Sequence, residues 1–156
     1  MEFRPGLAAD AEAIAGLIAS FQSELTDDPS GAGAERYLAS VSVQAEREYL
    51  TSDRYRYLVA YSESQLAGVI AIRDDSHLFH LFVERAYQRQ GIARQLWERA
   101  LRELRAAGAG EDITVNSSLS AVQVYQAFGF VPSGTIQRVH GISFLPMRRP
   151  PLPGRG

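Results

Sequence analysis

The segment between residues 77 and 110 constrains the fold of this chain more than any other. A short apolar run, 77–83, leads through a polar turn into apolar side chains at helical spacing. These side chains are Ile92, Leu96, Trp97, Ala100, Leu101 and Leu104. Gly108 and Gly110 follow where the helix is expected to stop. This order predicts a buried strand, a tight connection and an amphipathic helix that packs on a sheet.

The N-terminal part of the chain is expected to contribute a strand and two helices. Residues 2–4 favour a short first strand. Apolar side chains recur at helical spacing over residues 10–25 and predict one amphipathic helix. Turn-forming residues at 26–33 end that helix and predict a mobile loop. A second helix is expected over residues 37–49.

A β-hairpin is expected directly before the constraining segment. Residues 55–61 and 66–73 are rich in aromatic and branched side chains, and four polar residues separate them. Runs of this composition around a short polar turn favour two antiparallel strands. The strand over residues 77–83 follows, so the sheet is expected to contain a hairpin beside a central strand.

The C-terminal part completes an α+β domain. A strand is expected at 112–116, a helix at 120–128, and short strands within 130–147. Strands that alternate with helices after a hairpin predict a mixed sheet. The sequence shows neither a repeat nor a second domain, so we expect a single domain over 1–147. The proline- and glycine-rich residues 148–156 predict a flexible tail.

Composition excludes several functional classes. The formal net charge is -2 and the pI is about 5.9, which argues against nucleic acid as a partner. The chain has no cysteine, which excludes disulfides, a thiolate nucleophile and sulfur-rich zinc sites. The histidines have no spacing that indicates a metal site. No signal peptide and no membrane-spanning segment are evident, so we expect a cytoplasmic protein.

The polar turn at residues 83–93 is suited to holding an anion. Gly91 and Ala93 are small and allow a ligand to approach the backbone, and the amides at a helix start carry the positive end of its dipole. A plain strand-to-helix connection also needs a glycine, so spacing alone leaves both interpretations open. The nucleotide-binding patterns GxxxxGK[ST] and GxGxxG are absent.

Two motifs resemble the GNAT superfamily, the Gcn5-related N-acetyltransferases. The residues Gln88-Arg89-Gln90-Gly91-Ile92-Ala93 match the family signature [QR]xxGx[GA]. A second block, from Val115-Asn116-Ser117-Ser118 through Ala121 and Tyr125 to Gly129-Phe130, is similar to the family's strand and following helix. The resemblance implies a twisted, mostly antiparallel mixed sheet flanked by about four helices.

The same resemblance implies acetyl-CoA as the cosubstrate and assigns its binding residues. In the signature segment these are Gln88, Arg89, Gln90, Gly91, Ile92, Ala93 and Arg94. The backbone amides of Arg89, Gln90, Gly91, Ala93 and Arg94 would hold the pyrophosphate. The main chain of Phe82 and Val83 would pair with the pantetheine arm. Ser118 occupies a position where many relatives have asparagine, so Asn116 is the candidate for contacting the pantetheine or the substrate amide.

Acyl transfer from a thioester to an amine requires a proton donor, a base and an oxyanion donor. By its match to the family, Tyr125 would be the general acid that protonates the CoA sulfur; the alternative is a core tyrosine on an amphipathic helix. The candidate bases are His77, His80 and Glu84. The alternative is that the histidines are structural and Glu84 solvated. A backbone amide near Phe82, at a β-bulge, is expected to hold the oxyanion.

The acceptor is expected to be a primary amine of a small molecule, peptide or protein. Its site would be formed by the first two helices, the 26–33 loop and the C-terminal hairpin. Glu24, Asp27 and Asp28 would attract a cationic amine, unless they only form a solvated helix end. The competing interpretations are a non-catalytic acyl-CoA-binding module and a protein-interaction module. Pairing of C-terminal strands would allow a homodimer.

Overall fold

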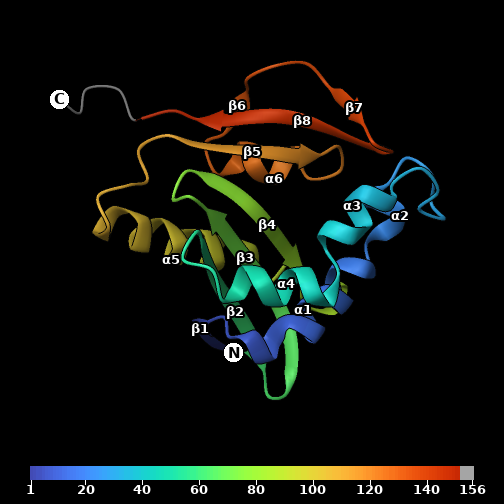
Figure 1. Ribbon diagram of the computed structural model, residues 1–156. Helices are drawn as coiled ribbons and strands as arrows, with labels where there is room; N and C mark the ends of the chain where they lie inside the picture. Colours follow the sequence, from blue (N-terminus) through green and yellow to red (C-terminus); the bar gives the residue numbers. More distant parts are fainter. Residues whose placement is uncertain (152–156) are drawn as a thin grey trace.

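A computed structural model describes residues 1–151, and a twisted eight-stranded sheet forms its centre (Figure 1). Its strands are β1 (Glu2–Pro5), β2 (Tyr55–Ser62), β3 (Gln65–Arg73), β4 (His77–Val83), β5 (Ile113–Ser118), β6 (Val131–Pro132), β7 (Gln137–Val139) and β8 (Ile142–Arg149). The order is β1-β2-β3-β4-β5-β8-β6, with β7 also paired to β8. Only the β4–β5 pair is parallel among these strands. The expected mixed, mostly antiparallel sheet is confirmed.

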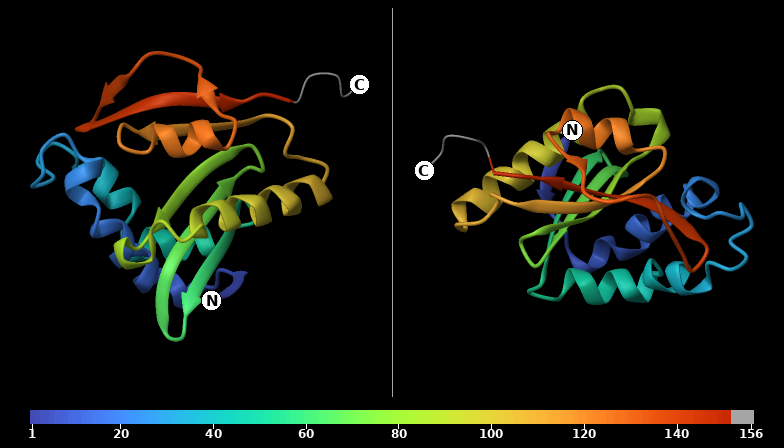
Figure 2. Two further views of the ribbon diagram at one scale, coloured as in Figure 1. Left: turned by 180° about the vertical axis from the view of Figure 1, so that it is seen from behind. Right: turned by 90° about the horizontal axis from the view of Figure 1, so that it is seen from above.

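Helices cover both faces of the sheet (Figure 2). They are η1 (Ala8–Asp10), α1 (Ala11–Ala19), α2 (Gln22–Leu25), α3 (Glu35–Ser40), α4 (Val43–Leu50), η2 (Arg85–Tyr87), α5 (Ile92–Ala106) and α6 (Val122–Ala127). The apolar sides of α5 and α6 share one buried cluster, and α1 packs with β2 and β3 in a second. Within the described residues no helix has the length and apolar character needed to cross a membrane.

Each of the two expected N-terminal helices is interrupted by a serine. The first is broken between α1 and α2, where the Ser20 hydroxyl donates to the Leu17 carbonyl at 2.6 Å. The second is broken between α3 and α4, where Ser42 is extended and its hydroxyl accepts from the Ala45 amide at 3.1 Å. Serine side chains that bond to nearby backbone groups compete with continuous helix, so two long helices become four short ones.

The last strand is longer than expected. β8 continues to Arg149, two residues beyond the boundary expected for the tail. Arg148 donates to both carboxylate oxygens of Asp112, at 2.8 and 2.7 Å, and Met147 is fully buried. These contacts hold the strand against β5. The rest of the expected tail includes residues 152–156, which lie outside the described part of the chain.

Close packing of α5 against β3 fixes where the helix begins. A Cβ atom at Gly68 would lie 3.1 Å from Leu96 Cδ1 and 3.3 Å from Ile92 Cγ2. Only a glycine lets the helix approach the strand this closely without displacing those side chains. The N-terminus of α5 therefore lies beside the C-terminal end of β4, where the connection between them begins.

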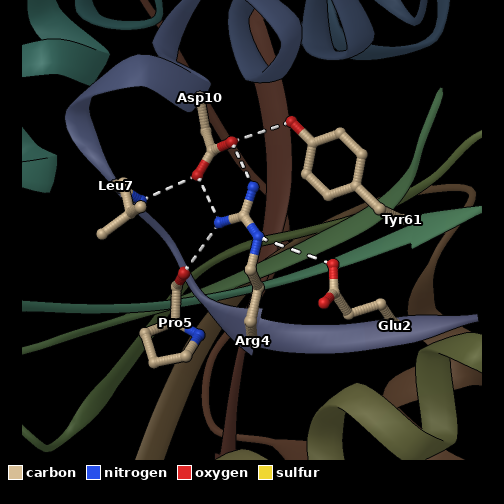
Figure 3. Close-up of polar contacts among 6 residues, drawn as sticks. All are labelled: Glu2, Arg4, Pro5, Leu7, Asp10 and Tyr61. Atoms are coloured by element: carbon tan, nitrogen blue, oxygen red, sulfur yellow. Dashed lines mark hydrogen bonds and ion pairs between the residues drawn. The ribbon is translucent and has the colours of Figure 1, made fainter. Parts of the chain in front are cut away.

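A buried carboxylate joins the N-terminal strand to the first helical turn (Figure 3). Asp10 accepts from Arg4 Nη1 and Nη2, each at 2.9 Å, from the Leu7 amide at 2.7 Å and from the Tyr61 hydroxyl at 2.8 Å. Burial by itself raises the pKa of Asp10, but these hydrogen bonds outweigh it, and the pKa is lowered from its ordinary value of 3.8. The folded state therefore favours the charged carboxylate.

We expect Asp10→Asn to lower the free energy of unfolding at neutral pH by about 2–3 kcal/mol, because it breaks a largely buried ion pair. Since the folded pKa of Asp10 is depressed, its contribution is complete above pH 3.8 and is lost as the pH falls through the folded pKa. Urea denaturation at several pH values measures this. The exposed Asp53→Asn is the control, and a loss at Asp10 as small as at Asp53 would contradict the prediction.

Candidate active site

The site begins where two parallel strands separate. β4 and β5 pair at His77 with Thr114 and at Leu78 with Val115, and the strands then diverge (Figure 1). The register between β3 and β4 shifts beside this point, so that Phe79 is the extra residue of a β-bulge. We expected the bulge near Phe82, and this was wrong by three residues. The bulge follows the last paired position directly, which turns β4 away from β5.

A cavity of about 750 Å³ opens on one side of this separation. It lies between the end of β4, the connection to α5, and α6. Most residues that the sequence assigned to acetyl-CoA line it: Phe82, Val83, Gln88, Arg89, Gly91, Ile92, Ala93, Arg94 and Tyr125. Two assigned residues do not. Gln90 is exposed outside the lining, and Asn116 lines a different, smaller cavity.

The connection before α5 presents backbone amides to this larger cavity. Arg89 and Gly91 both have positive φ, 64° and 80°, which turns successive amides toward one side. Within the described residues the amides of Arg89, Gln90 and Gly91 donate to no protein acceptor. The first amides of α5 add to them because a helix start leaves its amides unpaired. This is an anion cradle built from main chain.

Side-chain charge at the larger cavity is positive. Arg85, Arg89 and Arg94 line it together with one acidic residue, Glu24. Arg85 donates to Glu24 at 3.1 Å, and Arg94 lies over the Phe128 ring at 5.3 Å. Three cations against one anion suit a polyphosphate that enters along the backbone cradle.

A second cavity, of about 240 Å³, opens on the other side of the separation. The two cavities share residues from α2, β4, β5 and α6, which therefore form the partition between them. The shared residues are Leu25, Leu81, Phe82, Ser118, Ala121 and Tyr125. The two cavities therefore adjoin along these residues.

Tyr125 is the ionisable side chain at the partition. It is 6% exposed, and burial raises the pKa of its hydroxyl well above the ordinary value. The phenol is therefore protonated at neutral pH. Within residues 1–151 its hydroxyl makes no hydrogen bond, and it is not sealed from solvent. A protonated, uncommitted donor that borders both cavities is suited to hydrogen-bond a group between them.

His80 lines the smaller cavity and is held from behind by a buried carboxylate. Its Nε2 lies 2.9 Å from Glu46 Oε2, and the Tyr57 hydroxyl donates to Glu46 Oε1 at 2.7 Å. Glu46 is fully buried and His80 is 5% exposed. Burial, followed by the charge of Glu46, raises the pKa of Tyr57. The carboxylate fixes the orientation of the imidazole, as in a carboxylate–histidine pair.

The other two candidate bases are less suited to accepting a proton. His77 also lines the smaller cavity, but burial and the charge of Arg73 lower its pKa to about 4. Its Nδ1 lies 2.7 Å from the Thr114 hydroxyl. Glu84 lines neither cavity, and its carboxylate accepts from the Ala86 amide, which caps η2. Of the three, His80 alone both lines a cavity and is held by a carboxylate.

The acidic group expected to attract the acceptor is used elsewhere. Glu24 pairs with Arg85 beside the larger cavity. Asp27 accepts from the Ser143 hydroxyl at 2.6 Å, and its amide donates to the Gly141 carbonyl at 2.8 Å. Asp28 accepts from the Ser30 amide within its own turn. None of the three acidic residues lines the smaller cavity. Instead, the contacts of Asp27 dock the 26–33 loop on the β7–β8 hairpin, next to the smaller cavity.

Sequence reasoning missed two charged residues of this region. Glu46 lies on the buried side of α4, and a carboxylate within the apolar stripe of that helix was the signal that could have identified it. Arg73 lies at the end of β3 and lines the smaller cavity, and no local pattern distinguishes it from the other surface arginines.

Comparison with known proteins finds acetyltransferases. A family model described as an acetyltransferase (GNAT) domain matches residues 25–150. N-acetyltransferase 8 of Homo sapiens is 35% identical over 99 residues, which cover 56% of this chain and 44% of the relative. N-acetyltransferase family 8 member 3 of Rattus norvegicus is 33% identical over 99 residues, with 56% and 43% covered. The match thus spans less than half the length of these relatives.

Solved structures share the architecture over nearly the whole chain. A GCN5-related N-acetyltransferase from Rhodopseudomonas palustris superposes with a TM-score of 0.79 at 22% identity, covering 97% of this chain and 95% of that one. PaiA N-acetyltransferase from Thermoplasma acidophilum, solved in complex with coenzyme A, has a TM-score of 0.72 at 17% identity, with 96% and 98% covered. At these identities the likeness concerns the fold.

Proposed function

Because the chain belongs to the GNAT acetyltransferase family, we propose that it transfers an acetyl group directly from acetyl-CoA to a primary amine. The observation that carries the proposal is the meeting of two cavities at Tyr125. One cavity has an anion cradle and an excess of arginine, and the other has a histidine held by a carboxylate. A thioester and an amine bound in them would meet at the partition.

Acetyl-CoA would bind in the larger cavity. Its pyrophosphate would lie on the amides from Arg89 to Arg94, and its pantetheine arm would follow the open edge of β4 at Phe82 and Val83. Gln88 Nε2 donates to the Val83 carbonyl at 3.1 Å, which holds the loop beside that strand. Support comes from the main-chain geometry of the cradle, and two of the similar folds were crystallised with coenzyme A.

The reaction would form one C–N bond and break one C–S bond. His80 would accept a proton from the amine nitrogen, directly or through a water, and pass it to solvent. A backbone amide on the open edge of β4 would hold the oxyanion of the tetrahedral intermediate. Tyr125 would donate its proton to the departing sulfur and be reprotonated from solvent. Desolvation in the cleft raises the proton affinity of the thiolate, which favours this transfer.

The non-catalytic alternatives account for less of the structure. An acyl-CoA-binding module would need the anion cradle but not a second cavity that reaches the thioester end. An interaction module would need neither cavity. The buried His80–Glu46 pair at the second cavity favours catalysis over both, because burying an ionisable side chain completely is costly for a chain that does not use it.

Release of free CoA tests the proposal directly. Incubating the protein with acetyl-CoA and a panel of primary amines, with a thiol reagent as the detector, gives a signal from CoA alone because the chain has no cysteine. We expect thiol release that depends on both the enzyme and an amine, and an amine that gains one acetyl group by mass spectrometry. Binding of acetyl-CoA without amine-dependent release across small amines and peptides would favour the binding module.

For Tyr125→Phe we expect kcat to fall by about 10- to 100-fold, with the affinity for acetyl-CoA nearly unchanged, because only the proton donor is removed. Steady-state kinetics and calorimetry together check both parts. The aromatic ring still packs against Phe128 and Phe130, so the fold should persist. An unchanged kcat, with chemistry shown to be rate-limiting, would contradict the assigned role.

A further inference from the structure

Within residues 1–151, the lining of the smaller cavity contains an arginine and no carboxylate, although the proposed acceptor is an amine. Among its lining residues in the described chain, Arg73 is the sole Lys, Arg, Asp or Glu. The carboxylate of Glu46 contacts His80 but does not line the cavity, and it is fully buried. His77 is neutral at pH 7 because its pKa is lowered to about 4. Apart from the His80–Glu46 pair, the wall that the acceptor meets therefore carries one positive charge, on Arg73.

The guanidinium of Arg73 is not satisfied by a carboxylate. Its contact with Asp74 is a long 3.9 Å, whereas Asp74 accepts from Arg54 Nε and Nη2 at 2.9 Å each. Arg73 lies over the Phe79 ring at 5.4 Å, with its side chain 35% exposed. An arginine held on an aromatic face, with its donors uncommitted among the described residues, is suited to binding an anionic group of a ligand.

The rest of the cavity is aromatic and aliphatic. Its aromatic lining comes from four segments that the fold brings together: Tyr37 of α3, Phe79 and Phe82 of β4, Tyr125 of α6, and Phe144 of β8. Flat apolar side chains of this kind bind flat apolar ligands. His80 lies opposite Ala71 in the β3–β4 pairing and Arg73 lies opposite His77, so the base and the cation lie at different positions along the same strand pair.

We propose that the acceptor is a primary amine on a flat apolar body that carries no second cation, and that an anionic group at its far end is favoured by Arg73. This inference rests on the proposed acetyl transfer to amines. A second ammonium group would approach Arg73 without a carboxylate to pair with it, and like charges in a partly desolvated site repel. Polyamines and aminoglycosides, which carry several ammonium groups, are therefore poor acceptors for this chain.

Three amines of one shape test the proposal. They are phenethylamine and two para-substituted forms, one with a carboxylate and one with an aminomethyl group. We expect kcat/KM to be about tenfold or more higher for the carboxylate than for the aminomethyl form, with phenethylamine between them. In Arg73→Glu the order should reverse, and in Arg73→Gln the differences should shrink to about twofold. Arg102→Gln, at an exposed arginine outside the cavity, should keep the wild-type order.

Each result is decisive for one of two claims. Equal rates for the three amines, a preference for the aminomethyl form, or an order that Arg73→Glu and Arg73→Gln leave unchanged would overturn the inference while acetyl transfer stands. If the wild type acetylates none of the three but acetylates spermine, the inference is likewise overturned. If it acetylates no amine at all, the proposed function falls and the inference falls with it.

Discussion

Gly91→Glu is expected to lower the affinity for acetyl-CoA by at least about 100-fold. The new carboxylate would lie at the start of α5, among the amides that we assign to the pyrophosphate, and would repel it. A side chain at φ 80° also costs about 1–2 kcal/mol of backbone strain. A Cβ atom there would meet only Gln95 Nε2, at 4.0 Å, so packing does not oppose the substitution. Calorimetric titration measures the loss.

Gly108→Glu is the matched control for this experiment. Gly108 also has φ 80°, follows the C-terminal end of the same helix, and has no atom within 4 Å of an added Cβ. The two variants carry the same charge and the same backbone strain, but Gly108 lies outside the larger cavity. Equal affinities of the two variants for acetyl-CoA would show that the cradle before α5 does not hold the pyrophosphate.

His80→Gln is expected to lower kcat by about 100- to 1000-fold, because it removes the base while an amide keeps a hydrogen-bond donor for Glu46. The pH profile of kcat, recorded between about pH 5 and 8, should differ between the variant and the wild type. The affinity for acetyl-CoA should stay within about threefold, since His80 does not line the larger cavity. Stopped-time assays across this pH range, with the unfolding curve recorded in parallel, provide the measurement.

Two further variants separate catalysis from structure. His77→Gln alters a histidine of the same cavity whose pKa is about 4, and should change kcat by less than about threefold. Glu46→Gln replaces one of the two acceptor oxygens with an NH2 donor, so it disrupts the contact with His80 or with Tyr57 and should lower kcat. If His80→Gln only lowers thermal stability, with kcat and the pH profile unchanged well below the melting temperature, His80 is a structural residue.

Most helices and strands could be predicted from residues that are neighbours along the chain. The apolar series from Ile92 to Leu104 predicted α5, and the alternation of apolar runs with turns predicted β2, β3 and β4. The signature around Gly91 predicted the connection that lines the larger cavity. These features depend on residues that are neighbours along the chain, so spacing and turn chemistry suffice. The helix breaks at Ser20 and Ser42 were missed because side-chain hydrogen bonds, rather than apolar spacing, decide them.

The acceptor side of the site could not be predicted in the same way. Glu46 and His80 are 34 positions apart and meet only because α4 packs on β4. The bulge at Phe79 is a property of strand pairing, and Arg73 enters the cavity through the register of β3 with β4. The acidic residues around Asp27 left two alternatives open, attraction of the acceptor or a solvated helix end. In the structure, Ser143 of β8 and Gly141 of the turn before it engage Asp27. Long-range pairing determines all of these positions.

The titration of the wild-type chain with acetyl-CoA tests the central claim most directly, because it needs no knowledge of the acceptor. We predict saturable binding of one acetyl-CoA per chain, with a Kd in the range of about 1 μM to 1 mM that is typical of enzyme substrates. Coenzyme A should compete for the same site. A folded protein that binds neither acetyl-CoA nor coenzyme A at millimolar concentration would contradict the account, and the loop before α5 would then be only a connection.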